Sequence, residues 1–156
     1  MLPGMATFSI ERSATIAAAA EVIHALVNDF HHWTQWSPWE DIDPALERSY
    51  AGPEAGVGAH YAWQGTRKAG QGAMEITGSE ADVIRIRLEF VKPWKAVNQI
   101  EFRFAPAGAQ TAVTWSMSGE QSGLMAIIGK LMPMERLIGK DFEKGLARLR
   151  IAAEAT

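Results

Sequence analysis

Three carboxylates, Glu40, Asp41 and Asp43, directly follow a segment that is rich in tryptophan. A carboxylate at the mouth of an apolar pocket can act as an acid, a base or a polar anchor for a ligand. The sequence positions no second titratable group beside them, and Asp43-Pro44 is typical of the start of a turn. We therefore favour a solvated loop for this segment and keep the pocket role as the alternative.

The sequence offers no activated nucleophile. It contains no cysteine and no Gly-x-Ser-x-Gly motif. Ser37 lies inside the tryptophan-rich segment, but it precedes Pro38, and this favours a capping or turn role for its hydroxyl. Covalent catalysis is therefore not expected.

Metal and phosphate sites are not expected either, and no cofactor is predicted. His31 and His32 are adjacent and would point apart on a helix, while the other two histidines are isolated in the sequence. The glycine-rich segments 56–58 and 70–72 lack the further glycine and the strand-to-helix context of a dinucleotide-binding motif. Both are predicted to be hairpin turns or bulges.

The distribution of tryptophan indicates a binding surface. Trp33, Trp36 and Trp39 fall within seven residues, beside Pro38. Because an indole combines a large apolar ring with one polar N–H, this cluster is predicted to form a shaped apolar surface or the mouth of a pocket. The other tryptophans lie in or beside segments that alternate like strands: Trp63, Trp94 and Trp115.

The composition is typical of one globular domain. The 156 residues are 47% hydrophobic and 21% charged, with a formal net charge of -3. No basic patch favours nucleic acid, and no apolar segment is long enough to cross a membrane. No targeting signal is visible, so the expected location is the cytoplasm. We expect a single domain over residues 6–154 and a disordered start over residues 1–5, with translation beginning at Met1 or Met5.

The spacing of apolar residues predicts an α+β domain. A first strand around residues 8–12 precedes an amphipathic helix over residues 17–27 and a second short helix over residues 30–36. Six strands with a period of two and short connections predict an antiparallel sheet, at residues 46–51, 57–64, 72–79, 83–91, 97–105 and 111–119. A long helix is predicted over residues 134–153, with an apolar stripe formed by Met134, Leu137, Ile138, Phe142, Leu146, Leu149 and Ala153.

These elements predict an internal cavity. One helix across the concave side of a curved sheet leaves unfilled space, so we expect an apolar pocket of roughly 300–1,000 Å³. The Tyr61 hydroxyl and the indole N–H groups are the expected polar donors, which would suit a ligand with carbonyl or carboxylate oxygens. Residues 123–132, which are apolar and glycine-edged, are predicted to form either a lid or a static part of the core. The predicted lining is Trp36, Trp39, Tyr61, Trp63, Met74, Leu88, Phe90, Phe102, Trp115, Met117, Met134 and Ile138. For Tyr61, Trp63 and Trp115, ordinary core packing is the alternative.

A series of motifs runs in order along residues 8–153: Trp36-Ser-Pro-Trp39-Glu-Asp41, Tyr50-Ala-Gly-Pro-Glu-Ala-Gly-Val-Gly58, Trp63-x-Gly65, Gly70-x-Gly72, Phe90-x-x-Pro93, Thr111-x-Val-Thr-Trp115 and Gly139-Lys-Asp-Phe-Glu-Lys-Gly145-Leu. The series resembles polyketide cyclase/dehydrase-like proteins of the START-related (SRPBCC) superfamily. The resemblance implies a helix-grip (START-like) fold, in which a curved antiparallel sheet of about seven strands wraps around a long C-terminal helix, with two short helices after the first strand. It also implies an apolar cavity. Members of this superfamily bind lipids, hormones and polyketides, and few of them catalyse a reaction.

The function predicted from the sequence is binding of a hydrophobic small molecule, lipid-like or aromatic, by a monomer or homodimer. The alternative is a cyclase or dehydrase for a polyketide-like substrate, in which Tyr61 or an acidic residue near Glu40 moves protons. A third hypothesis is an assembly role through the exposed face or the edges of the sheet, which a large symmetric interface would support. Nucleic acid, stable membrane association and metal ions are not expected.

Overall fold

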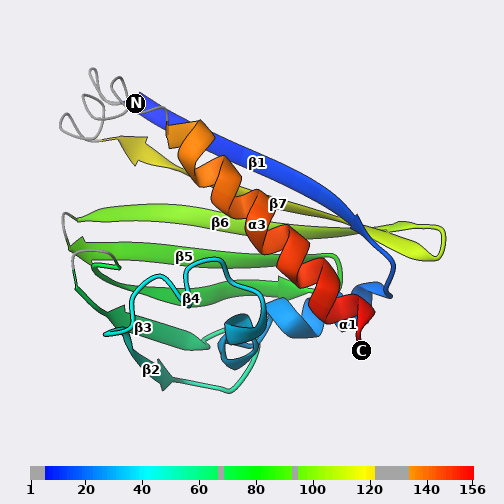
Figure 1. The fold of residues 1–156 in the computed structure, drawn as a ribbon, viewed down its shortest axis with the longest axis horizontal. Helices are drawn as coiled ribbons and strands as arrows, with labels where there is room; N and C mark the ends of the chain where they lie inside the picture. Colours follow the sequence, from blue (N-terminus) through cyan, green and yellow to red (C-terminus); the bar gives the residue numbers. More distant parts are fainter. Residues whose placement is uncertain (1–5, 67–68, 93–94, 122–133) are drawn as a thin grey trace.

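The computed structural model describes residues 6–66, 69–92, 95–121 and 134–156. Within them, seven antiparallel strands form one curved sheet in the order β1-β7-β6-β5-β4-β3-β2, and helix α3 lies across its concave side (Figure 1). This is the architecture predicted from the sequence. In chain order the elements are β1 (Ala6–Ile16), α1 (Ala20–Val27), η1 (Phe30–Gln35), β2 (Glu47–Ala51), β3 (His60–Gln64), β4 (Gln71–Glu80), β5 (Val83–Lys92), β6 (Ala96–Ala107), β7 (Gln110–Gln121) and α3 (Met134–Glu154).

The strands form where apolar and polar residues alternate. On β5, Ile84 and Ile86 are buried, while Arg85 between them is exposed. The pairing keeps buried residues of neighbouring strands side by side, since Ile86 lies opposite Ile100 on β6, and Ile100 lies opposite Met117 on β7. The predicted inner face of the sheet is therefore confirmed.

The glycine-rich segment before β3 is a turn. The sequence predicts a strand from residue 57, whereas β3 begins at His60. Gly56 and Gly58 have φ angles of 80° and 96°, a region that favours glycine and does not continue a strand. The turn is confirmed, and it shortens the strand that follows.

Two short helices cover one end of the concave face. Helix α1 begins at Ala20 rather than at residue 17, because β1 continues to Ile16. The next helix, η1, is a 3-10 helix capped by Asp29, whose carboxylate accepts the backbone N–H of His31 at 2.9 Å. Trp33 on η1 is buried and meets the ring of Phe102 edge-on.

Helix α3 presents an apolar stripe to the sheet. Phe142, Leu146 and Leu149 are buried, and Ile138 is partly buried against the same core. Leu137 was predicted to belong to this stripe, but its side chain is 47% exposed. One residue corresponds to about 100° around a helix, so Leu137 points away from the face defined by Ile138 and Phe142.

Three predictions concern parts of the chain outside the described residues. They are the disordered start over residues 1–5, the lid over residues 123–132 and the side chain of Met134.

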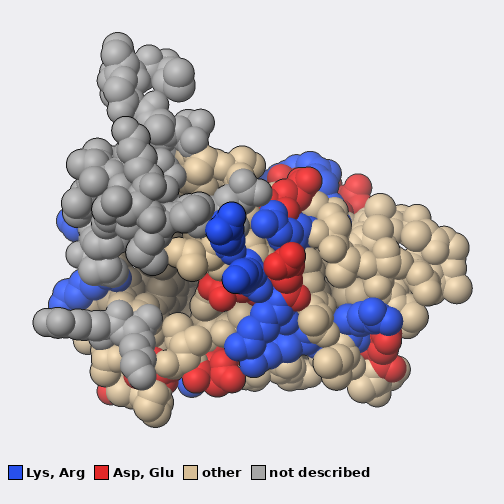
Figure 2. Space-filling view, turned by 45° about the horizontal axis from the view of Figure 1, so that its top comes forward, with Lys and Arg blue, Asp and Glu red and all other residues tan. Residues whose placement is uncertain are grey.

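Charges of both signs are mixed on the surface. Basic and acidic side chains lie next to one another across the middle of the face shown in Figure 2. Arg150, for example, pairs with Glu154 one turn further along α3 at 3.1 Å. None of the helices in the described ranges is both long enough and apolar enough to cross a membrane.

Candidate functional site

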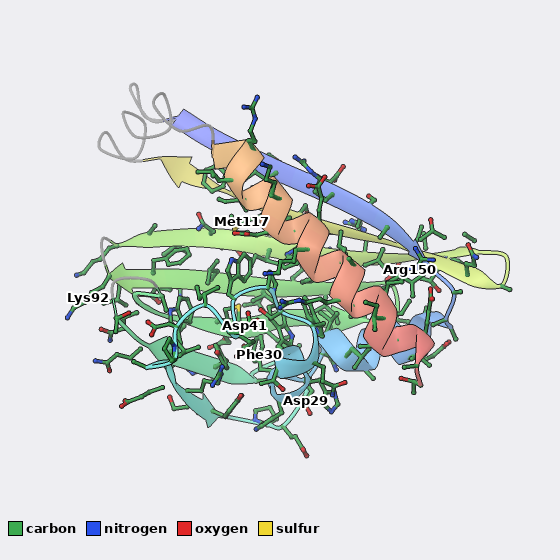
Figure 3. All side chains as sticks on the ribbon, viewed as in Figure 1. Asp29, Phe30, Asp41, Lys92, Met117 and Arg150 are labelled. Carbon is green, nitrogen blue, oxygen red and sulfur yellow. The ribbon has the colours of Figure 1, made fainter. Side chains whose placement is uncertain are left out.

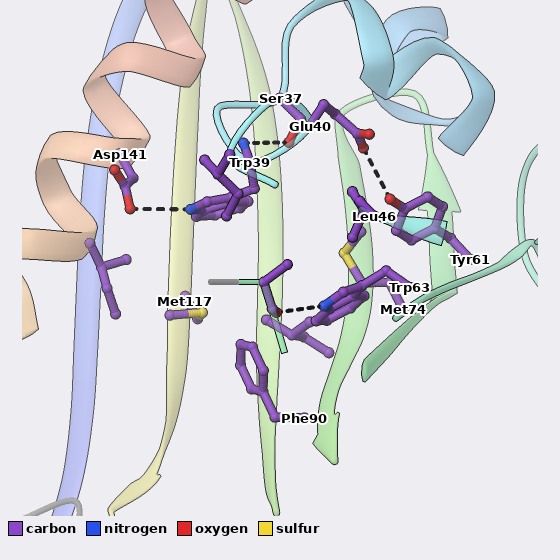
Figure 4. Close-up of a pocket in the computed structure, with 14 residues that line it drawn as sticks. Ser37, Trp39, Glu40, Leu46, Tyr61, Trp63, Met74, Phe90, Met117 and Asp141 are labelled. Carbon is purple, nitrogen blue, oxygen red and sulfur yellow. Dashed lines mark hydrogen bonds between the residues drawn. The ribbon is translucent and has the colours of Figure 1, made fainter. Parts of the chain in front are cut away.

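A cavity of about 270 Å³ lies between the inner face of the sheet and the first half of α3 (Figure 4). The loop between η1 and β2 completes its wall. The volume is slightly below the predicted range, and the mainly apolar wall with a few polar groups is typical of a small-molecule site. The lining residues are Ser37, Trp39, Glu40, Ile42, Leu46, Tyr61, Trp63, Ala69, Met74, Leu88, Phe90, Met117, Ile138 and Asp141.

Trp63 on β3 forms a fixed part of the aromatic wall. Its Nε1 donates to the carbonyl of Ala69 at 2.9 Å, and its ring meets Phe90 edge-on with centroids 5.8 Å apart. Gly72 lies against the indole ring, and any side chain at that position would collide with it. Gly72 therefore shapes the cavity wall. It also lies at an irregularity in the pairing of β4 with β5.

Tyr61 and Glu40 form a polar pair on the wall. The Tyr61 hydroxyl donates to Glu40 Oε1 at 3.2 Å, and the guanidinium of Arg48 donates to Glu40 Oε2 and to the Glu40 carbonyl. Burial, reinforced by the nearby Glu40 carboxylate, raises the pKa of Tyr61 well above its usual value. Tyr61 is therefore a protonated donor at neutral pH, whereas an efficient proton-transfer group has a pKa near the working pH.

Asp141 on α3 faces the cavity from the side opposite Tyr61 (Figure 4). Its Oδ2 accepts the indole N–H of Trp39 at 3.1 Å. The Trp39 ring also packs edge-on against Trp115 and Phe142. These contacts tie the loop after η1 to the helix that covers the cavity.

The other two carboxylates of the predicted loop have structural roles. Asp43 is buried, which corrects the expectation of a solvated side chain. It accepts the N–H of Ala45 at 2.9 Å, as the predicted turn requires, and it also accepts the N–H and hydroxyl of Thr66. Asp41 is exposed beside Arg148, whose hydrogen bond and charge lower the pKa of Asp41. Of the three carboxylates, only Glu40 reaches the cavity.

The structure brings most of the predicted lining residues together. Those on the cavity wall are Trp39, Tyr61, Trp63, Met74, Leu88, Phe90, Met117 and Ile138. A ligand-binding role for them stays a prediction.

Three predicted lining residues lie in the closed core beside the cavity instead: Trp36, Phe102 and Trp115. Trp36 packs edge-on against the other two rings, with centroids 5.8 and 5.6 Å away. It points inward because η1 lies over the core and because its Nε1 donates to the buried carbonyl of Leu26 at 2.9 Å. Trp36 is therefore not at the mouth of the pocket.

Asp141 lines the cavity but is not among the residues predicted to do so from the sequence. Asp141 follows Ile138 by three residues and precedes Phe142, so helical periodicity places it on the buried stripe. An acidic residue at an apolar position of an amphipathic helix is the signal that could have identified it. Four further lining residues were not predicted, because they lie in loops, whose course periodicity does not predict: Ser37, Ile42, Leu46 and Ala69.

No metal centre is evident in the part of the chain that the structure describes, where no three His, Asp or Glu side chains converge. His31 is engaged with Asp29 instead, with Nδ1 and Oδ1 2.8 Å apart.

A curved antiparallel sheet, one long helix across it and an apolar cavity between them define a helix-grip domain. The chain belongs to the family described as polyketide cyclase / dehydrase and lipid transport, whose sequence profile matches residues 7–154. No curated protein matches the chain significantly in sequence.

Solved structures share this fold at low sequence identity. A protein from Chromobacterium violaceum has a TM-score of 0.67 and 12% identity, over 94% of this chain and 96% of that one. A protein of unknown function from Staphylococcus aureus has a TM-score of 0.68 and 11% identity, over 97% and 96% of the two chains. Norcoclaurine synthase from Thalictrum flavum, in complex with a transition-state analogue, has a TM-score of 0.64 and 13% identity, over 96% and 98%.

Proposed function

We propose that this chain binds an apolar small molecule in the cavity between the sheet and α3 and holds it without changing it chemically. The observation that carries the proposal is the cavity itself, whose aromatic and aliphatic wall is enclosed by the sheet, the helix and the loop after η1. The family description, which includes lipid transport, supports an apolar ligand. The organisation of the polar groups supports binding over catalysis, because Glu40 is engaged by Arg48 and Tyr61 has a raised pKa.

The test is a calorimetric titration with a neutral probe that suits a small aromatic-walled cavity, 1-naphthylmethanol. We expect saturable binding with one site. Leu88→Trp should abolish it, because Leu88 is buried on the cavity wall and the larger indole would occupy the space.

The matched control is Val97→Trp, which adds the same side chain at an exposed position on β6. This variant should bind the probe as the parent protein does. Equal binding by the Leu88→Trp protein, shown to be folded by circular dichroism, would contradict the proposal.

A cyclase or dehydrase is the second candidate, and one observation favours it. Glu40 and Tyr61 present a hydrogen-bonded acid and hydroxyl to the same cavity. The two functions are distinguished by incubating the co-purified ligand with the protein and analysing it by chromatography coupled to mass spectrometry. A ligand that is recovered unchanged supports binding. A loss of water would indicate dehydration, and an isomer of the same mass with a new elution time would indicate cyclisation.

A further inference from the structure

Among the described residues that line the cavity, the charged groups are all of one sign. They are two carboxylates, Glu40 and Asp141, with no lysine, arginine or histidine beside them in this part of the chain. From this asymmetry we propose that the ligand is an organic ammonium ion, with an aromatic or alkyl body in the cavity and a protonated amine against Asp141. This inference rests on the proposed function and specifies the class of its ligand.

The polar donors that the sequence predicted for a ligand are engaged within the protein wherever the described residues place them on the wall. The N–H of Trp39 donates to Asp141, the N–H of Trp63 donates to the carbonyl of Ala69, and the Tyr61 hydroxyl donates to Glu40. A ligand carboxylate or carbonyl would therefore find these three donors already used. This reverses the ligand chemistry that was predicted from the sequence.

Asp141 differs from Glu40 in how its charge is balanced. Glu40 is paired with the guanidinium of Arg48. Within the described ranges, Asp141 is in no ion pair, and its hydrogen bond comes from a neutral indole. Each carboxylate oxygen can accept more than one hydrogen bond, so Asp141 retains acceptor capacity for an ammonium group.

The aromatic wall provides a second and independent attraction for a cation. Trp39, Tyr61, Trp63 and Phe90 all line the same cavity. The faces of such rings attract ammonium groups electrostatically, and the attraction increases where water is excluded. Rings and carboxylate together therefore favour a cationic head over a neutral or anionic one.

The test compares three probes with the same bicyclic ring: 1-naphthylmethylamine, 1-naphthylmethanol and 1-naphthoic acid, titrated by calorimetry at neutral pH. The parent protein should bind the amine about tenfold more tightly than the alcohol and should bind the acid most weakly. In Asp141→Asn, which keeps an acceptor for Trp39, the ratio of amine to alcohol affinity should fall to near one. Glu143→Gln removes an exposed carboxylate from the same helix and should keep the ratio.

The outcomes separate this inference from the proposed function. If all three probes fail to bind the parent protein, the cavity-binding function is wrong and the inference falls with it. If the alcohol binds but the amine has no advantage, only the inference is overturned. An unchanged ratio of amine to alcohol affinity in Asp141→Asn would also overturn the inference. Because this ratio compares two ligands on one protein, a general loss of affinity in the variant does not change it.

Discussion

The concave face of the sheet has two halves that use similar residues in different ways. The core half is closed, and its rings are fully or almost fully buried: Trp33, Trp36, Phe102, Trp115 and Phe142. The cavity half is hollow, with Trp39, Tyr61, Trp63, Phe90 and Met117 on its wall. In Figure 3, Met117 lies near the first half of α3, whereas Asp29 and Phe30 lie toward α1.

The strands themselves do not explain this difference. On β7, Trp115 belongs to the closed core and Met117 to the cavity wall, although they are successive residues of the same face. On β4, Ile76 and Met74 divide in the same way. One strand thus contributes to both halves.

The elements above the sheet make the difference. Helices α1 and η1 place large side chains over the core half, among them Ile23, Leu26 and Trp33, whereas the loop after η1 lies over the cavity half. In this protein the position of the cavity is therefore set by where α1 and η1 end, because the sheet presents the same kind of apolar face to both halves.

The largest expected effect is on the core half. Phe142→Ala should lower the free energy of unfolding by about 3–5 kcal/mol, because the ring is fully buried and stacks on Trp115 with centroids 4.0 Å apart. Ile138→Ala, one turn earlier beside the cavity, should cost only about 1 kcal/mol, since this side chain is partly exposed. Urea unfolding measures both values, and equal losses would show that the two halves are packed alike.

Two glycines of α3 differ in how closely the rest of the protein packs against them. A methyl group at Gly145 would lie 2.8 Å from the Trp115 ring and 3.0 Å from Pro38, so Gly145→Ala should destabilise the protein by about 1–3 kcal/mol. At Gly139 the methyl group would meet the end of the Arg12 side chain, which can move. Because alanine also has the higher helix propensity, Gly139→Ala should change the stability by less than about 1 kcal/mol. Thermal melts of the two variants provide the comparison, and a larger loss at Gly139 would contradict it.

Tryptophan emission should report ligand binding from the cavity half alone. Trp36 is fully buried without a ligand, whereas Trp39 lines the cavity. A saturated neutral ligand such as cyclooctanol should therefore reduce acrylamide quenching in Trp36→Phe as it does in the parent protein. Trp39→Phe should lose part of this effect, and the double variant Trp39→Phe/Trp63→Phe should lose most of it, because Trp63 also lines the cavity. Protection that persists in the double variant and disappears in Trp36→Phe would reverse the assignment of the two halves.

The smallest effect concerns pH. Burial raises the pKa of Tyr61 in the folded protein above the ordinary value of about 10 for a tyrosine. The stability associated with its neutral form is thus fully present below pH 10 and is lost as the pH rises above it, because the unfolded chain ionises first. Tyr61→Phe should flatten this alkaline loss, measured as the free energy of unfolding from about pH 9 to about pH 11. The same slope in both proteins would mean that Tyr61 is more accessible than its burial indicates.

The sheet and α3 could be predicted because their evidence is local. Alternation in β4 to β7 identifies one apolar face, and this face is the buried one. The cavity wall on the sheet follows from the same pattern, as Met74, Leu88 and Met117 illustrate. Periodicity is sufficient for such residues because the pleat fixes their direction.

The division of the tryptophan cluster could not be predicted in the same way. Trp33, Trp36 and Trp39 are close in sequence, but their burial depends on the geometry of η1 and on partners far along the chain. The helical pattern could have placed Asp141 on the buried stripe, but its hydrogen bond with Trp39 joins segments far apart in the sequence. Where a side chain's role depends on a contact between distant segments, residue type and spacing do not determine it.

The pairing of β1 with β7 has a consequence for how the protein is made. These strands run antiparallel along the whole of β1, from Ala6 opposite Gln121 to Ile16 opposite Thr111. β1 is therefore synthesised well before its partner β7, and contacts between such distant segments slow folding. Until β7 emerges, the backbone of β1 is open to pairing with other nascent chains. Since α3 follows β7 and contributes Asp141 to the cavity, a ligand finds a complete site only after α3 has left the ribosome.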